Sequence, residues 1–445
     1  MSMFACDKRT EKEKNFDYPT TSDVVFGNGG LSVQMGNHLF FVNGFKDISS
    51  SSEYERNKSY SHGSLMLANL KDDGSIYAND DGSLDEENYI IFSDKLCGFN
   101  VSGLFVSGEY LYFSTPCQEA TGKEGKADFE WQREYVEFYR VKLDKTSKPE
   151  KMYQTDYSYT NMDFKFFSNG NRTCVVICKD GNNLYAKDLD SKDTIFDFYD
   201  VKSFVFPENG ENLFYVQEKT ENNKTKRVLN RVDVYTGATE TFKTTDSTSE
   251  LEVKLSNDKY VFASYKTNSY TNLYRFGFDK QEKSIMSFDS NKKNLTLVDE
   301  NTIIFSSGNK FKFAKDKLLF DTVFEDAEAE SVTIIGTTDG SVVYYDNNNK
   351  LKMFSYSNVL AGQDAKMETL TTLDSTSDMG ELDTYFDMND GRYLYFFKNV
   401  KNENNSDSTG HYYLHRIKIK NRIDEKEELI GVYESADAPT VDEEK

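Results

Sequence analysis

The sequence predicts an all-β protein, and specifically a single eight-bladed β-propeller with four strands in each blade. The first observation is composition, because aromatic residues make up 14% of the 445 residues and only five residues are proline. Abundant Tyr, Phe, Thr, Asn and Gly are typical of many short strands joined by turns. The second and third observations are two apolar motifs that alternate along the chain, and their spacing.

The first motif is a polar residue followed by an apolar and aromatic burst. Such a strand is apolar on both faces, as expected of a strand enclosed between neighbouring blades, and we assign it as the second strand outward, strand B. A weak copy at residues 172–177 leaves seven blades as the alternative. The copies lie at residues 38–43, 109–114, 172–177, 212–217, 259–264, 302–307, 341–346 and 392–397.

The second motif alternates apolar and polar residues with period two and follows each copy of the first, so we assign it as strand C. Shorter runs before B and after C predict strands A and D. The copy at residues 311–314 is also weak. The copies begin at residues 65, 138, 184, 229, 273, 311, 351 and 414, so the middle ones lie 38 to 46 residues apart, the length of one four-stranded blade.

No composition break divides the repeats, so one domain is expected over residues 29–434. Residues 1–28 are predicted to be an N-terminal tether leading into the propeller, and residues 435–445 a disordered acidic tail. The net charge of −22 disfavours binding to nucleic acids and a polybasic contact with membranes. No apolar run approaches the roughly 20 residues of a membrane helix.

The N-terminal residues resemble the end of a bacterial lipoprotein signal, because Ala5 precedes Cys6 and a charged run follows. Five residues are too few for a complete signal, so an ordinary cysteine is the alternative. The chain has a recurring sequence pattern, of which Tyr-Leu-Tyr-Phe (110–113) followed by Tyr-Arg-Val-Lys-Leu-Asp (139–144) is one copy. In this pattern the chain resembles extracytoplasmic propeller lipoproteins of low-GC Gram-positive bacteria. These include domains of unknown function distantly similar to low-density-lipoprotein-receptor propellers. The resemblance implies a propeller at the cell surface, lipid-anchored through Cys6, but no activity.

Cys97 and Cys117 flank a predicted hairpin. If its turn centres on Ser107, paired positions sum to 214, and 97 + 117 = 214, so the two cysteines would face each other as a disulfide pair. Two reduced thiols are the alternative. Cys174 and Cys178 lie about 13 Å apart on one strand and are expected to be core residues.

Three connections between strands B and C are long, at residues 44–64, 115–137 and 398–413. They belong to the first, second and last repeats, which are neighbours in a closed ring. We therefore predict one binding surface, with neutral loop variation as the alternative. Its aromatic anchors would be Tyr54, Tyr60, Phe129, Trp131 and Tyr135.

Catalytic signatures are absent from the sequence. The four histidines lack a nucleophile motif, and no phosphate loop, dinucleotide-binding glycines or zinc cluster occurs. An acidic loop at residues 72–87 fails the EF-hand pattern, so neither a cofactor nor a metal is predicted. The sequence favours a non-catalytic module that binds a protein or glycan. A carbohydrate-active enzyme, a glycosidase or lyase working in the central channel, is one alternative, and a cell-envelope scaffold is another.

Overall fold

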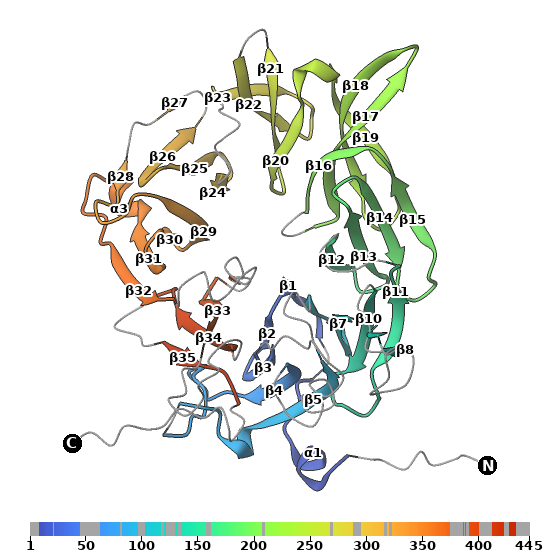
Figure 1. The fold of residues 1–445 in the computed structure, drawn as a ribbon, viewed down its shortest axis with the longest axis vertical. Coiled ribbons are helices and arrows are strands. Elements are labelled where there is room, and N and C mark those ends of the chain that lie inside the picture. The colour runs from blue at the N-terminus through green and yellow to red at the C-terminus, as the bar shows by residue number, and fades with distance from the viewer. Residues whose placement is uncertain are drawn as a thin grey trace.

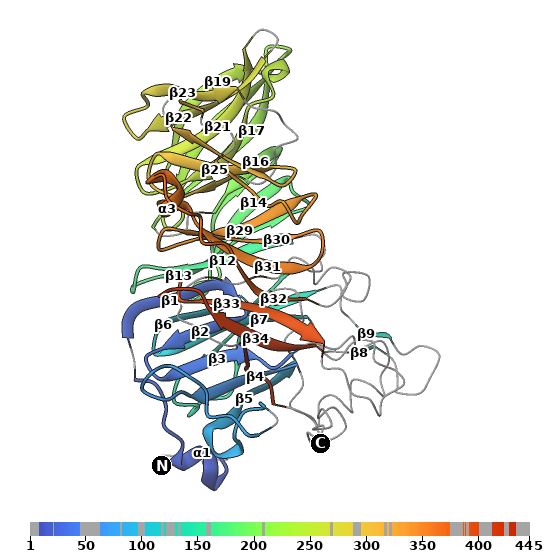
Figure 2. The same cartoon turned by 90° about the vertical axis from the view of Figure 1, so that its left-hand side faces the viewer.

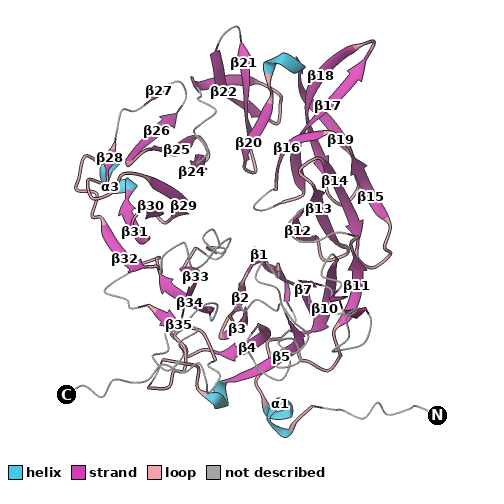
Figure 3. Cartoon of the chain, viewed as in Figure 1, coloured by secondary structure: helices cyan, strands magenta, loops and turns pink. Residues whose placement is uncertain are grey.

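The structure is a computed structural model in which eight antiparallel sheets surround a central axis as the blades of a β-propeller (Figures 1 and 3). Each blade is built from consecutive strands, named A to D from the axis outward. The structure describes residues 9–20, 22–44, 63–80, 82–96, 103–116, 120–121, 130–131, 135–156, 162–206, 210–267, 270–287, 295–315, 318–319, 323–373, 386, 388, 391–399, 412–421 and 427–432.

Blades 1 to 4 contain complete A-to-D sets. Blade 1 has β2 (Ser32–Met35), β3 (His38–Val42), β4 (Ser64–Asn69) and β5 (Tyr89–Leu96); blade 2 has β6 (Leu104–Gly108), β7 (Tyr110–Pro116), β10 (Val136–Lys142) and β11 (Glu150–Gln154); blade 3 has β12 (Met162–Ser168), β13 (Thr173–Lys179), β14 (Asn183–Asp188) and β15 (Thr194–Phe198); blade 4 has β16 (Val201–Val205), β17 (Asn212–Glu221), β18 (Lys224–Asp233) and β19 (Thr239–Asp246).

Blades 5 to 8 continue the same order, and the described part of blade 8 contains strands B, C and D. Blade 5 has β20 (Glu252–Ser256), β21 (Tyr260–Thr267), β22 (Tyr270–Gly277) and β23 (Glu282–Ser287); blade 6 has β24 (Leu295–Leu297), β25 (Thr302–Ser307), β26 (Lys310–Lys315), β27 (Leu318–Leu319) and the short β28 (Phe324–Glu325); blade 7 has β29 (Val332–Thr338), β30 (Ser341–Asp346), β31 (Lys350–Ser355) and β32 (Glu368–Thr372); blade 8 has β33 (Tyr393–Asn399), β34 (Tyr412–Lys418) and β35 (Glu428–Leu429).

The eight-bladed prediction is confirmed, and the seven-bladed alternative is wrong. Both weak motif copies form strands in the expected places, because residues 173–177 lie in β13 and residues 311–314 lie in β26. In the part of the chain that the structure describes, the helical elements are short: α1 (Glu11–Asn15), α3 (Tyr356–Leu360) and the 3₁₀ turns η1 (Glu86–Asn88) and η3 (Ser247–Ser249). Within the described residues no helix is long and apolar enough to cross a membrane.

One strand was not expected from the sequence. Most of β1 (Ser22–Gly30) lies in the segment assigned to the tether, residues 1–28, yet β1 pairs antiparallel with β6, inside the innermost strand of blade 2 (Figure 1). Its ladder is irregular, with register shifts on both sides of Phe26. The glycine-rich sequence 27–30 lacks the aromatic burst that marks the other strands, so the repeat pattern did not reveal it.

The core consists of separate apolar layers between neighbouring blades. Strand B supplies both of its faces to these layers, as β3 illustrates. Leu39 and Phe41 pack toward blade 8, whereas Phe40 and Val42 pack toward blade 2. This alternation explains why the B strands lack polar positions in the sequence.

A repeated arginine of strand C adds a polar contact to these layers. Arg140 of blade 2 donates to Asp190 of blade 3 at 2.7 Å, and its guanidinium lies over the ring of Tyr110. In blade 8 the corresponding Arg416 lies over Tyr393 and donates to the Gly74 carbonyl of blade 1 at 2.6 Å. A strand C arginine therefore joins the last and first blades through a backbone carbonyl, and joins blades 2 and 3 through a carboxylate.

Candidate functional site

The propeller has two faces with different connections. The A–B and C–D turns lie on one face, called the C–D face here, and the B–C and D–A connections lie on the other, called the B–C face. The connections β3–β4, β7–β10 and β33–β34 are long, and their blades 1, 2 and 8 are neighbours in the ring. The β7–β10 connection contains β8 (Ala120–Thr121) and β9 (Glu130–Trp131), which pair with each other and project from the body (Figure 2).

The structure describes only part of the predicted aromatic surface. Trp131 lies on β9 opposite Ala120, and the partly buried Tyr135 immediately precedes β10. Tyr54, Tyr60 and Phe129 lie outside the described residues. The aromatic surface therefore stays a prediction.

The hairpin argument for the Cys97–Cys117 pair placed the turn incorrectly. In the β6–β7 ladder Ser107 pairs with Tyr110, so paired positions sum to 217 and not to 214. Gly108 adopts a φ of 59°, which lets the chain turn at Gly108 and Glu109. Cys6, Cys97 and Cys117 lie outside the described residues, and the disulfide stays a prediction without its geometric support. Cys174 and Cys178 are free, buried thiols as expected.

Buried polar groups hold the roots of the long connections. At the end of β3, the Asn43 side chain donates to the Val432 carbonyl at 3.0 Å and accepts from the Val432 backbone N–H at 2.8 Å. This pair of bonds joins blade 1 to blade 8. At the start of β10, buried Glu137 accepts from Tyr139 at 2.7 Å and from Lys151 at 2.8 Å. These contacts fix the places where two connections leave the scaffold.

The root of the blade 8 connection is a charged cluster, called the blade 8 cluster here. Glu427 lies with an oxygen 2.7 Å from Nδ1 of His415 and accepts from Lys398 at 3.1 Å and from Thr371 of blade 7 at 2.5 Å. Burial raises the pKa of Glu427, but the contacts with His415, Thr371 and Lys398 outweigh burial and lower the pKa to about 2. The His415 ring stacks on Phe396. The side chains of Glu427, His415 and Lys398 keep some exposure to solvent, between 12% and 26%.

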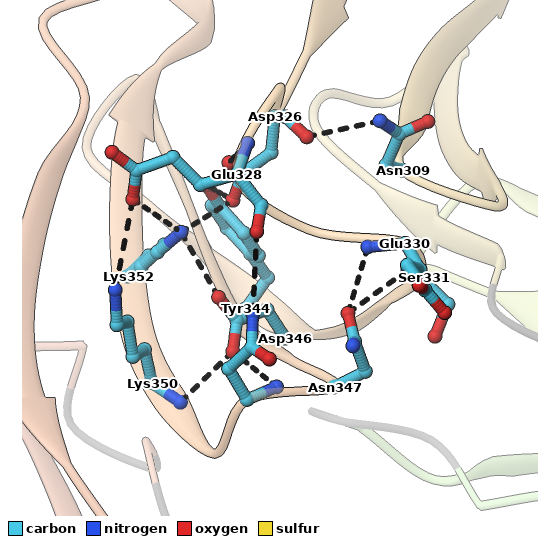
Figure 4. Close-up of polar contacts among 11 residues, drawn as sticks. Asn309, Asp326, Glu328, Glu330, Ser331, Tyr344, Asp346, Asn347, Lys350 and Lys352 are labelled. Atoms are coloured by element: carbon cyan, nitrogen blue, oxygen red, sulfur yellow. Dashed lines mark hydrogen bonds and ion pairs between the residues drawn. The ribbon is translucent and has the colours of Figure 1, made fainter.

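A second cluster, called the blade 7 cluster, lies one blade away and is fully enclosed (Figure 4). Lys352 contacts Asp326 at 2.8 Å and Asp346 at 2.9 Å, and these three side chains are 0% exposed. The Tyr344 hydroxyl also donates to Asp326 at 3.0 Å. Burial lowers the pKa of Lys352, but the two carboxylates outweigh it and raise the pKa. Burial likewise raises the pKa of Asp326, but Lys352 and further hydrogen bonds lower it below its usual range.

Sequence reasoning missed both clusters. Lys352 and His415 stand in the strand C motif, whose alternation predicts that polar side chains point outward. Their carboxylate partners, Asp326 and Glu427, come from connections that are distant in the sequence. The one available signal was the lysine or histidine directly after the first leucine of strand C, at positions 352 and 415. In the part of the chain that the structure describes, no group of three or more His, Cys, Asp or Glu is arranged to hold a metal ion.

Comparison with known proteins finds similarity to solved structures alone. No protein-family model and no curated protein matches the sequence. Similar solved structures include TolB from Acinetobacter baumannii, with 14% identity over 50% of this chain and 58% of that one at a TM-score of 0.30. This chain thus spans little more than half of that TolB.

Two further solved structures cover more of the chain. An oligogalacturonate lyase in complex with manganese has 11% identity, 85% and 96% coverage of the two chains and a TM-score of 0.43. The β-propeller domain of the Trilobed protease from Pyrococcus furiosus has 12% identity, 81% and 100% coverage and a TM-score of 0.38.

Proposed function

We propose that this propeller is an extracytoplasmic recognition module, lipid-anchored through Cys6, that binds a protein or glycan with the B–C connections of blades 8, 1 and 2. The observation that carries the proposal is that three neighbouring blades have long connections on one face. Loops held by a rigid scaffold are where proteins place recognition surfaces, because the scaffold limits the entropy lost on binding.

The described roots support this proposal. Asn43, Glu137 and the Lys398–Glu427 pair each fix one connection through buried or partly buried polar contacts. A connection fixed at its root starts from a defined position and direction, which favours a preorganised surface. Tyr54, Tyr60, Phe129, Trp131 and Tyr135 supply the aromatic area that protein and glycan interfaces use as anchors.

The test compares three forms of the protein in a pull-down from the native cell envelope with quantitative mass spectrometry. The first is intact, and the second has residues 45–62, 117–132 and 400–409 replaced by tight turns. The matched control shortens the β17–β18 hairpin of blade 4, which also lies on the B–C face and pairs as far as Glu221 with Lys224.

The proposal expects a partner that the intact form and the hairpin control retain and the loop-shortened form loses. Purified partner or glycan must then bind the intact form directly, with affinity lowered by replacing Trp131 with alanine. Equal retention by all three forms contradicts the proposal and directs attention to the central channel, where a carbohydrate-active enzyme would work. Capture of the protein's own copies, dependent on divalent cations, would instead support an envelope scaffold.

A further inference from the structure

The segment before β1 docks on the C–D face, opposite the long connections. Lys145, in the C–D turn of blade 2, bonds both the Glu13 carboxylate and the Ile91 carbonyl of blade 1. Arg9 donates to the Asp144 carbonyl in the same turn at 3.2 Å. Lys12 donates to the carbonyl of Glu86 in the C–D connection of blade 1.

Apolar packing and local structure reinforce this docking. Phe16 and Tyr18 pack against the apolar layer between blades 1 and 2, and the Tyr18 hydroxyl donates to the Glu13 carbonyl at 2.9 Å. Thr10 and Glu13 form a capping box that starts α1. Burial raises the pKa of Glu13, but Lys145 and Thr10 outweigh it and lower the pKa, in keeping with an ionised carboxylate facing Lys145.

Cys6 therefore has a short reach. Arg9 lies three positions after Cys6 in the sequence, and an extended chain spans at most about 3.6 Å per position, or about 11 Å in all. Strand B of blade 2, β7, has seven residues, so the two faces are separated by roughly 20 Å of strand. A chain of this reach cannot bring an anchor at Cys6 around to the B–C face.

We infer that the docked segment 9–18 sets the orientation of the propeller on a lipid bilayer, with the C–D face of blades 1 and 2 against the membrane and the B–C connections pointing away. This inference rests on the proposed lipid anchor. A flexible tether would let the molecule tumble, whereas a docked segment holds one face toward the anchor. In Figure 2, α1 lies at the lower left edge of the molecule, whereas β8 and β9 project at its right side. The recognition surface would thus be presented to partners outside the membrane.

The single tryptophan, Trp131, is a natural probe of the B–C face because it lies on β9. The test attaches a maleimide lipid to Cys6 in a Cys97→Ser, Cys117→Ser protein, in which the remaining thiols Cys174 and Cys178 are buried. The lipidated protein is bound to phosphatidylcholine vesicles containing a doxyl-labelled lipid, which quenches nearby tryptophan. A companion protein carries Trp131→Phe and Tyr77→Trp, since Tyr77 is exposed in the C–D connection of blade 1.

The inference expects the doxyl lipid to quench the tryptophan fluorescence of the Tyr77→Trp protein. The fluorescence of the protein with native Trp131 should stay unquenched. A flexible Gly/Ser spacer inserted between Cys6 and Arg9 should remove this difference, whereas near-ultraviolet circular dichroism should stay unchanged. Equal quenching without the spacer, or stronger quenching at Trp131, overturns the inference. The anchor is tested separately by the mass of the Cys6 peptide from the native host. An unmodified Cys6 would remove the proposed anchor, while an orientation failure with the synthetic lipid would remove only this inference.

Discussion

The blade 7 and blade 8 clusters occupy equivalent positions in consecutive blades, but one is closed and the other is open. Lys352 lies opposite Tyr344 in the β30–β31 ladder, and His415 lies opposite Phe396 in the β33–β34 ladder. Each pair packs toward the preceding blade. Asp346 in blade 7 and Lys398 in blade 8 then occupy the end of strand B.

The difference follows from the connection above each cluster. In blade 7 a short turn joins β30 to β31, and Asp346 also caps that turn by accepting from the Asn348 and Lys350 backbone N–H groups. In blade 8 the long connection leaves from the same place. The blade 7 ions are paired within the chain and excluded from water, so loss of one partner leaves a buried charge, whereas the blade 8 cluster lies at the root of a long connection and keeps contact with solvent.

The largest effect is expected for Lys352→Met. Removing the cation leaves Asp326 and Asp346 buried side by side without a counter-charge. We expect the free energy of unfolding to fall by about 3–5 kcal/mol, measured by urea denaturation. The matched control is Lys350→Met, two residues earlier and partly exposed, which should change it by less than about 0.5 kcal/mol. Similar losses for the two variants would contradict the closed structural role of the blade 7 cluster.

Blade 8 also has a fully buried arginine, on its other side. Arg416 is 0% exposed and bonds Glu428 and the Gly74 carbonyl, whereas Arg140 in the equivalent position of blade 2 is 18% exposed. We expect Arg416→Met to lower the free energy of unfolding by about 2–4 kcal/mol, and Arg140→Met by about 1 kcal/mol. If the two variants lose the same free energy of unfolding, then burial of the Arg416 guanidinium adds nothing to the contact between blades 8 and 1.

An acid-side loss of stability is expected from the blade 8 cluster. The pKa of Glu427 is about 2 in the folded protein against a usual 4.5, so its stabilising contribution is complete above about pH 4.5 and disappears as the pH falls toward 2. After solvent screening we expect about 1–2 kcal/mol. Glu427→Gln should flatten the dependence of the unfolding midpoint on pH over this window. The exposed control Glu300→Gln should keep the wild-type dependence of the unfolding midpoint on pH. If the Glu427→Gln variant also keeps it, Glu427 is not the source of the acid-side loss of stability.

The sequence could predict the repeating frame because strands B and C carry a periodic signal, and each of the sixteen motif copies overlaps a strand of the structure. It could not predict β1, because pairing at the inner edge of β6 leaves no periodic pattern in a glycine-rich segment. Nor could it predict the clusters. Asp326 and Lys352 are 26 residues apart, and Thr371 and Glu427 are 56 apart, so only folding brings them together.

The smallest loss of stability is expected for Lys398→Met, and the coupling energy between Lys398 and Glu427 should distinguish the blade 8 cluster from the blade 7 cluster. We expect Lys398→Met to lower the free energy of unfolding by at most about 1 kcal/mol, because Lys398 is 26% exposed and water can solvate Glu427 in its absence. A double-mutant cycle of Lys398→Met with Glu427→Gln should give a coupling energy well below that of Lys352→Met with Asp326→Asn. Comparable coupling in the two cycles would show that the blade 8 cluster is as closed energetically as the blade 7 cluster, and its role would then be to hold blades 7 and 8 together.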